Sequence, residues 1–157
     1  MRLYMKQKVF SWKDKFSIKT ESGEDRYYVE GKAISIGKKL RIYDPAENEL
    51  AFVNQKVVSL MPKFCVEMNG EEVAVIKKKI TFLKPKYLIE GPGWEVKGDF
   101  FSHDYEIVEN GRTIVAIHKK WMAWGDSFEL DIVDESQEVL AVAVVIAIDA
   151  VMDDQGS

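Results

Sequence analysis

The sequence predicts an all-β protein with one helix: a closed antiparallel barrel of about twelve strands that encloses a C-terminal apolar helix. Three observations predict this fold class: a spacing of apolar residues that recurs six times, turn-forming residues between the recurrences, and one long apolar run near the C-terminus. The chain has 157 residues, and we expect residues 1–157 to form a single domain.

The recurring unit begins with lysine and places apolar residues at the fourth, eighth and tenth positions after it. The units start at Lys8, Lys32, Lys56, Lys79, Lys97 and Lys120, at intervals of 24, 24, 23, 18 and 23 residues. Such a period indicates one supersecondary unit copied along the chain. The eighth and tenth positions alternate with polar residues, as Phe128 and Leu130 do with Ser127 and Glu129, which is typical of a half-buried strand. A chance spacing in a meandering sheet would predict the same all-β class.

Turn-forming residues separate the predicted strands at 21–25, 44–48, 68–72, 90–93 and 109–113. Asn-Gly at 69–70 and at 110–111 is a strong signal for a tight hairpin. Six units of two strands each therefore predict about twelve strands between residues 2 and 133.

The apolar run EVLAVAVVIAIDAVMDD has three alternatives: a membrane span, a buried strand or a helix inside the protein. Its uninterrupted part, from Val139 to Ile148, would span about 15 Å as a helix, against a hydrocarbon core of about 30 Å. Asp149 follows, and no Lys or Arg follows Lys120 to set an orientation, so we expect no transmembrane segment. Its length and the capping-box form of Asp134 and Gln137 predict a helix over about 136–152.

A helix that is apolar on every side must be enclosed on every side, and a barrel of about twelve strands has room for one. Alanines at 141, 143, 147 and 150 keep this helix slim. Asp149, Asp153 and Asp154 oppose the helix dipole and require partners from elsewhere in the chain. The predicted core residues of the helix are Val139, Leu140, Val142, Val144, Val145, Ile146, Ile148 and Val151.

The net charge of -4 is unevenly distributed along the chain. All 22 Lys and Arg lie in residues 1–120, whereas residues 121–157 hold nine of the 26 acids and no base. This balance argues against a nucleic-acid binder with a broad basic face. Cys65 is the only cysteine, which excludes an intrachain disulfide and favours a reducing compartment. The N-terminus lacks the apolar core of a secretory signal, so we expect a cytoplasmic protein.

Neither catalytic nor metal-ligating residues emerge from the pattern. His103 and His118 lack a second His or Cys at ligand spacing, and we expect each on the surface or on an edge strand. Cys65 has no evident base and is expected to be a buried, inert thiol. The sequence therefore predicts no catalytic residues, no metal and no cofactor. Trp12, Trp121 and Trp124 are expected to pack in the core at a barrel end, with insertion at a membrane interface as the alternative.

Two basic clusters stand out. They permit two interpretations: a site for an anionic headgroup, or solvated strand edges where lysine discourages edge-to-edge pairing. The second is favoured, because a lysine opens all six units as a structural position would. The clusters consist of Lys38, Lys39 and Arg41, and of Lys77, Lys78, Lys79, Lys84 and Lys86.

Five blocks resemble the LURP-one-related family: YMKQKVFSWKDKFSI, VEGKAISIGKKLRIYD, KITFLKPKYLIEG, KKWMAWGDSFELDI and VLAVAVVIAIDAV. The chain looks like a short bacterial member of that family, whose relatives include the tubby C-terminal domain and the phospholipid scramblases. The resemblance implies twelve antiparallel strands around a C-terminal apolar helix. Tubby domains bind phosphoinositides and scramblases act at membranes, although no lipid-binding residue is carried over position by position.

These observations lead to two expectations about function. The first is a non-catalytic module that binds an anionic lipid or membrane surface and lies peripheral to the membrane. The alternative is a soluble protein-interaction or signalling scaffold without lipid affinity, which the net negative charge and the acidic C-terminal segment 121–157 favour.

Overall fold

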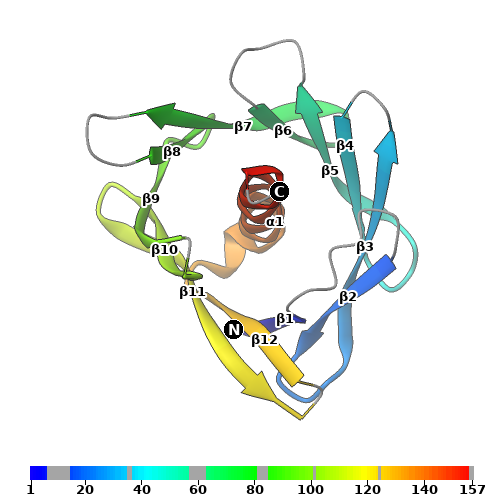
Figure 1. Cartoon of the computed structure of the whole chain (residues 1–157). Coiled ribbons are helices and arrows are strands. Elements are labelled where there is room, and N and C mark those ends of the chain that lie inside the picture. Colours follow the sequence, from blue (N-terminus) through cyan, green and yellow to red (C-terminus); the bar gives the residue numbers. More distant parts are fainter. Residues whose placement is uncertain are drawn as a thin grey trace.

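The computed structural model describes residues 1–6, 15–34, 37–56, 63–80, 85–100, 102–123 and 125–155. In this part of the chain, twelve antiparallel strands close into a barrel around one helix, which confirms the predicted fold class (Figure 1). The strands are β1 (Arg2–Lys6), β2 (Lys15–Thr20), β3 (Asp25–Ile34), β4 (Gly37–Tyr43), β5 (Glu49–Lys56), β6 (Lys63–Met68), β7 (Glu71–Ile80), β8 (Pro85–Glu90), β9 (Trp94–Asp99), β10 (Asp104–Glu109), β11 (Arg112–Met122) and β12 (Gly125–Ile132).

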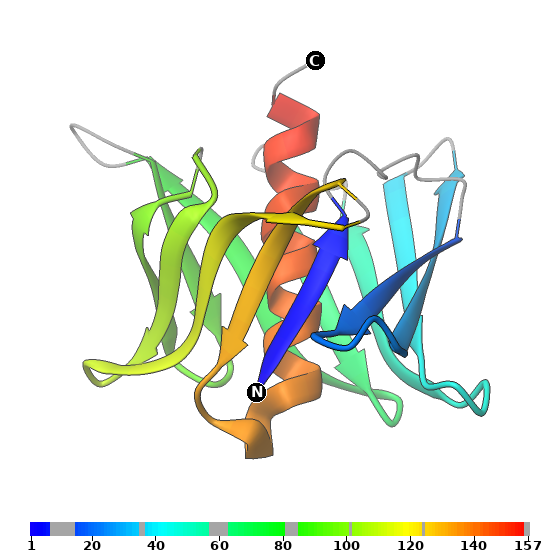
Figure 2. The ribbon, with the colours of Figure 1, turned by 90° about the horizontal axis from the view of Figure 1, so that it is seen from below.

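Each strand pairs with its neighbours in the chain, and β1 pairs with β12 to close the barrel. The even-numbered strands β2 to β10 join the next strand at one end of the barrel, through the turns predicted at 21–25, 44–48, 68–72, 90–93 and 109–113. At the opposite end the odd-numbered strands finish and the even-numbered strands begin. We call this the upper end, because it lies at the top of Figure 2, where the C-terminal half of the helix also lies.

The six sequence repeats correspond to the six even-numbered strands of the barrel. In all six units the eighth and tenth positions fall on an even-numbered strand and point into the core, where each is at most 8% exposed. Alternation of inward and outward side chains explains this pattern, because residues two apart share one face of a strand. These core residues are Phe16, Ile18, Leu40, Ile42, Phe64, Val66, Tyr87, Ile89, Tyr105, Ile107, Phe128 and Leu130.

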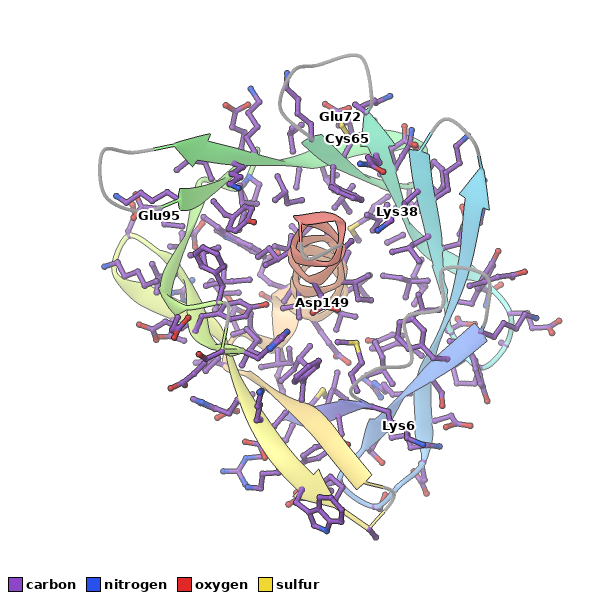
Figure 3. The ribbon with its side chains drawn as sticks, viewed as in Figure 1. Lys6, Lys38, Cys65, Glu72, Glu95 and Asp149 are labelled. Carbon is purple, nitrogen blue, oxygen red and sulfur yellow. The ribbon has the colours of Figure 1, made fainter. Side chains whose placement is uncertain are left out.

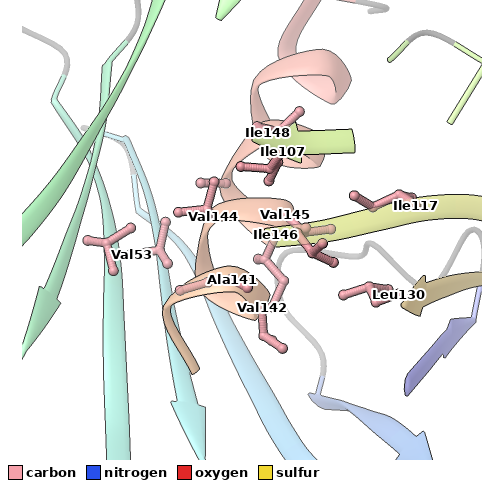
Figure 4. Packing of buried hydrophobic residues seen from close by; sticks show 14 of the residues in the cluster. Val53, Ile107, Ile117, Leu130, Ala141, Val142, Val144, Val145, Ile146 and Ile148 are labelled. Atoms are coloured by element: carbon pink, nitrogen blue, oxygen red, sulfur yellow. The ribbon is translucent and has the colours of Figure 1, made fainter. Parts of the chain in front are cut away.

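The helix α1 (Glu138–Gln155) runs through the middle of the barrel (Figures 1 and 2). Its side chains from Ala141 to Ile148 are at most 2% exposed and pack against residues such as Val53 and Leu130 (Figure 4). Of the predicted core residues, Val142, Val144, Val145, Ile146 and Ile148 are buried, and Val139 and Leu140 are partly buried against the core. The alanines at 141, 143, 147 and 150 are fully buried, whereas the side chain of Val151 lies outside the described set.

The helix begins at a polar entry. Asp134 is an N-cap as predicted, and its carboxylate accepts a hydrogen bond from the backbone N–H of Ser136 at 3.2 Å. Hydrogen bonds from Ser136 lower the pKa of this carboxyl group. A short 3₁₀ helix, η1 (Glu135–Gln137), precedes α1, so Gln137 donates its backbone N–H to the carbonyl of Asp134. The helix therefore starts two residues after the expected position.

Asp149, whose negative charge opposes the helix dipole, has a hydrogen-bond partner from outside the helix. Its Oδ1 lies 3.0 Å from Nε2 of His103, whose ring stacks on Phe128 at 4.2 Å between centroids. His103 is not on an edge strand: it precedes β10 in a turn, and its side chain is 21% exposed, so only part of it reaches the surface that was expected for it. His118 does lie exposed on β11, beside Asp104. The side chains of Asp153 and Asp154 lie outside the described set.

The expectation of core packing is also wrong for Trp121, which is 75% exposed. The cause is an unequal strand length. β11 continues past the first residue of β10, since Tyr105 at the start of β10 pairs with Ile117, so the last residues of β11 pair with β12 alone. Trp12 and Trp124 lie outside the described residues.

Candidate anion-binding surface

The two predicted basic clusters lie on separate parts of the barrel wall. Lys38, Lys39 and Arg41 are on β4, whereas Lys77, Lys78 and Lys79 are on β7 and Lys86 is on β8. Two strands, β5 and β6, separate β4 from β7. Lys84 lies outside the described residues. The sequence clusters are therefore not one contiguous patch by themselves.

Lys38 and Lys78 differ from the other predicted residues in direction. Each lies two residues from an inward residue, Lys38 from Leu40 and Lys78 from Ile76, so both belong to the inner face of the barrel near its upper end. Figure 3 shows Lys38 inside the ring of strands. Both side chains are half-buried and have interactions of their own, so they are not part of an outer binding surface.

Arg41 is also excluded, because its guanidinium group already has partners. Its Nη1 donates to Oε1 of Glu49 at 2.6 Å, and the group lies 4.2 Å above the ring of Phe52. An anion would have to displace this ion pair.

The strand register brings together lysines that are distant in the sequence. Lys56 stands directly opposite Lys63, and Lys63 stands directly opposite Lys77 on its other side. The same ladder places lysine opposite lysine twice more, at Lys32 with Lys39 and at Lys79 with Lys86. We call these positions from β3 to β8 the lysine belt: Lys32, Lys39, Lys56, Lys63, Lys77, Lys79 and Lys86.

Like charges directly opposite each other destabilise a sheet, because side chains at such positions stand only about 4.5–5.5 Å apart at Cβ. A carboxylate from a neighbouring strand relieves this repulsion for Lys77, whose Nζ lies 2.9 Å from Glu90. Among the described residues no carboxylate forms an ion pair with Lys56 or Lys63. The centre of the belt therefore has cationic groups that an external anion would neutralise.

A surface depression of about 470 Å³ lies between these lysines. It is lined by Lys56, Lys63 and Lys77, by Glu72 and Glu90, and by Cys65 and Val75. Its three ammonium groups exceed its two carboxylates, which favours an anionic ligand. Cys65 is buried as predicted, and burial together with the nearby Glu72 raises the pKa of its thiol to about 11. The thiol is thus protonated at neutral pH and contributes no thiolate nucleophile.

The barrel wall beside the belt has the opposite charge. A depression of about 490 Å³ across β2 to β4 is lined by Lys15, Glu30, Asp44, Glu47, Tyr28, Tyr43 and Pro45. Its three carboxylates and single ammonium group would repel an anion. The basic surface therefore covers one sector of the barrel and does not surround it.

Lys32, Lys56 and Lys63 were missing from the predicted site. The signal for them is in the repeat: the seventh position after the opening lysine is also lysine in the first four units, at Lys15, Lys39, Lys63 and Lys86. In three of these units the described ladder pairs the opening lysine with the seventh residue. In the last two units the seventh position is Asp104 or Ser127, which ends the belt.

Metal and membrane-spanning sites have no support within the described residues. No group of three or more His, Cys, Asp or Glu side chains there could hold a metal ion. No helix in the same part of the chain is both long enough and apolar enough to cross a bilayer.

Comparison with known proteins decides the family. The LURP-one-related (LOR) family pattern matches residues 1–149, which is nearly the whole chain. The chain belongs to the LURP-one-related family. This LOR protein is similar to the uncharacterized protein YxjI of Bacillus subtilis (strain 168), with 35% identity over 152 residues that cover 97% of this chain and 94% of the relative. The family predicted from the sequence blocks is thereby confirmed.

The LOR fold also has a counterpart among solved structures. An X-ray structure of an Arabidopsis thaliana protein matches with a TM-score of 0.62 and covers 94% of this chain and 90% of that chain. Its sequence identity is 13%, so the match supports the fold alone.

Proposed function

We propose that this LOR protein is a non-catalytic module that binds an anionic membrane surface through the lysine belt. The observation that carries the proposal is the register Lys56–Lys63–Lys77, in which three lysines stand side by side across β5, β6 and β7. The arrangement costs stability when the surface is free, and a phosphate-bearing surface would reverse that cost.

The position of the belt suits a surface more than a deep pocket. Lys56 ends β5 and Lys63 begins β6, so both lie at the upper end of the barrel, and Lys86 is the second residue of β8 at the same end. Each lysine held near an anionic leaflet contributes about 1 kcal/mol of attraction. Four belt lysines have described side chains that form no ion pair with a described residue, and they would therefore give a binding energy that falls as salt screens the charges: Lys39, Lys56, Lys63 and Lys86.

The alternative of a protein-interaction scaffold depends on the acidic C-terminal segment 121–157, and this segment exposes less negative charge than its composition suggests. Glu129 and Glu138 are at most 9% exposed, and each is paired, with Lys120 and Arg26 respectively. Asp149 lies against His103. These three of the nine acids after Lys120 are therefore held against the barrel by partners, which weakens the argument for an acidic docking face.

Co-sedimentation with vesicles tests the proposal. The purified protein is mixed with phosphatidylcholine vesicles, or with vesicles that also contain phosphatidylserine or a phosphoinositide, at about 50 and 200 mM salt. We expect sedimentation only with anionic vesicles, and less of it at the higher salt concentration. Equal behaviour with neutral and anionic vesicles would overturn the proposal and direct attention to protein partners.

A matched pair of variants locates the site. Lys56→Glu with Lys63→Glu reverses two charges at the centre of the belt and is expected to abolish the salt-sensitive sedimentation. Lys15→Glu with Lys97→Glu makes the same change in net charge at exposed positions outside the belt. Equal losses in both double variants would show that net charge acts and that the belt does not.

A further inference from the structure

Trp121 is an exposed tryptophan in a protein that buries its other described tryptophan. Its exposed fraction is 75%, whereas that of Trp94 is 1%. The other large apolar side chains that are exposed in the described residues are Met1 and Val133, which precede β1 and follow β12 at the lower end of the barrel. Within the described part of the upper end, Trp121 therefore stands out as the large apolar side chain in water.

The backbone holds Trp121 in this position. It pairs with Asp126 across the ladder of β11 and β12, which continues to the pair Met122 and Gly125. The hairpin is thus paired throughout its length, although β10 does not reach it. Exposure of the indole is consequently a property of an ordered strand pair, since β10, the neighbour of β11 on its other side, does not extend to it.

Two lysines precede Trp121 on β11, at the same end of the barrel as the lysine belt. Lys119 and Lys120 precede it on β11 and are exposed, with Nζ of Lys120 lying 3.3 Å from Glu129. β11 finishes at the end of the barrel where β5 finishes at Lys56 and β6 begins at Lys63. An anionic surface that approaches this end of the barrel would therefore lie near both the belt and Trp121.

We propose that Trp121 inserts into the headgroup region of the membrane that the lysine belt attracts. The inference rests on the proposed function and extends it from a charged surface to a lipid bilayer. Indole suits this region because its ring is apolar and its N–H group remains hydrated. Binding of a soluble phosphate compound by the belt would not involve Trp121, since that ligand offers the ring no apolar layer.

The test compares a bilayer with a soluble polyanion. Trp121→Ala is expected to weaken partitioning to phosphatidylcholine and phosphatidylserine vesicles about tenfold, which corresponds to roughly 60 Å² of apolar surface left in water. Retention on heparin should not change, because heparin presents charge without an apolar layer. Trp121→Tyr keeps an amphipathic ring and should recover most of the partitioning.

Fluorescence gives a second measurement on the unaltered side chain. Vesicles with brominated acyl chains should quench part of the tryptophan emission of the wild type, and this part should be missing in Trp121→Tyr. Because Trp121 is exposed, both variants should melt at the wild-type temperature. Partitioning of Trp121→Ala equal to that of the wild type, with no quenching lost, would overturn insertion and leave the lysine surface intact. Failure of the wild type to bind anionic vesicles at all would overturn both proposals.

Discussion

The guanidinium group of Arg26 on β3 forms two hydrogen bonds with the carboxylate of Glu138 in the first turn of α1. Nε donates to Oε1 at 2.9 Å and Nη2 donates to Oε2 at 3.1 Å. The hydroxyl of Tyr27 donates to the same Oε1 at 2.6 Å. Burial, followed by the bond to Glu138, raises the pKa of Tyr27 above its ordinary value. This cluster fixes the start of the central helix to the barrel wall.

Replacement of Arg26 by alanine should therefore destabilise the protein. Glu138 is buried, so after this change its charge would remain largely buried with Tyr27 as its one described partner. We expect a loss of about 1–3 kcal/mol in the free energy of unfolding, because Arg26 itself is partly exposed and water replaces some of the interaction. Urea denaturation measures this loss.

A double variant and a surface variant show whether the loss of stability comes from the buried charge of Glu138. Arg26→Ala combined with Glu138→Gln should recover part of the lost stability, since the buried charge is then absent. Arg112→Ala removes an arginine that is 65% exposed and pairs with Glu109 and Asp134 at 3.4 and 3.3 Å. It should change stability by less than about 0.5 kcal/mol. Equal effects at Arg26 and Arg112 would contradict a fixing role for the buried cluster.

The enclosed helix makes a second prediction. Val145 is 2% exposed inside the barrel, and Val145→Asp would bury a charge without a partner. The cost of several kcal/mol is comparable with a total stability of about 5–15 kcal/mol, so the variant should be unfolded. Val133→Asp makes the same substitution at a position that is 58% exposed and should leave the melting temperature nearly unchanged. Circular dichroism compares the two, and a folded Val145→Asp protein would refute the enclosed-helix structure.

The core could be predicted from the sequence because it depends on local periodicity. The eighth and tenth positions of each unit, such as Phe64 and Val66, are two residues apart and must share a face of one strand. The same is true of the apolar run in α1, which has no polar side to expose. Both predictions can be made without knowledge of which strands pair with each other.

The candidate site depended on information that local patterns do not contain. His103 and Asp149 are 46 residues apart, and their contact follows from the position of the helix inside the barrel. Exposure of Trp121 follows from the difference in length between β10 and β11. The Lys56–Lys63 pair depends on the ladder register, because a shift by two residues keeps each face but changes every cross-strand partner.

Alkaline pH should unfold the protein through its buried tyrosines. Burial raises the pKa of Tyr87 to about 12, and burial with a hydrogen bond to Glu129 raises the pKa of Tyr4 to about 12. The unfolded chain loses these protons near pH 10, whereas the folded chain keeps them. Stability is therefore full below about pH 10 and is lost as the pH rises toward about 12.

Melting temperature measured as a function of pH checks this expectation. The decline should begin near pH 10 and should accompany the absorbance change of tyrosinate. Tyr87→Phe should reduce the decline, because it removes one of the raised groups, and its effect at neutral pH should be small, since Oη of Tyr87 has no hydrogen-bond partner among the described residues. A melting temperature that stays constant up to pH 12 would contradict the raised pKa values.

Because the belt lysines repel one another, Lys63→Glu should stabilise the protein although it weakens binding to anionic vesicles. Lys63→Glu places a carboxylate between Lys56 and Lys77, its two direct neighbours in the ladder. We expect a gain of about 0.5–1 kcal/mol in the free energy of unfolding at low salt, and a smaller gain at high salt where the charges are screened. The same variant should bind anionic vesicles more weakly.

Lys97→Glu provides the matched control, because Lys97 stands opposite Glu106 on β10. The same charge change there creates a like-charge pair and should destabilise the protein slightly at low salt. Denaturation of both variants at two salt concentrations separates the outcomes. A loss of stability in Lys63→Glu would mean that the belt lysines do not repel one another. The stability argument for an external anion at their centre would then fail.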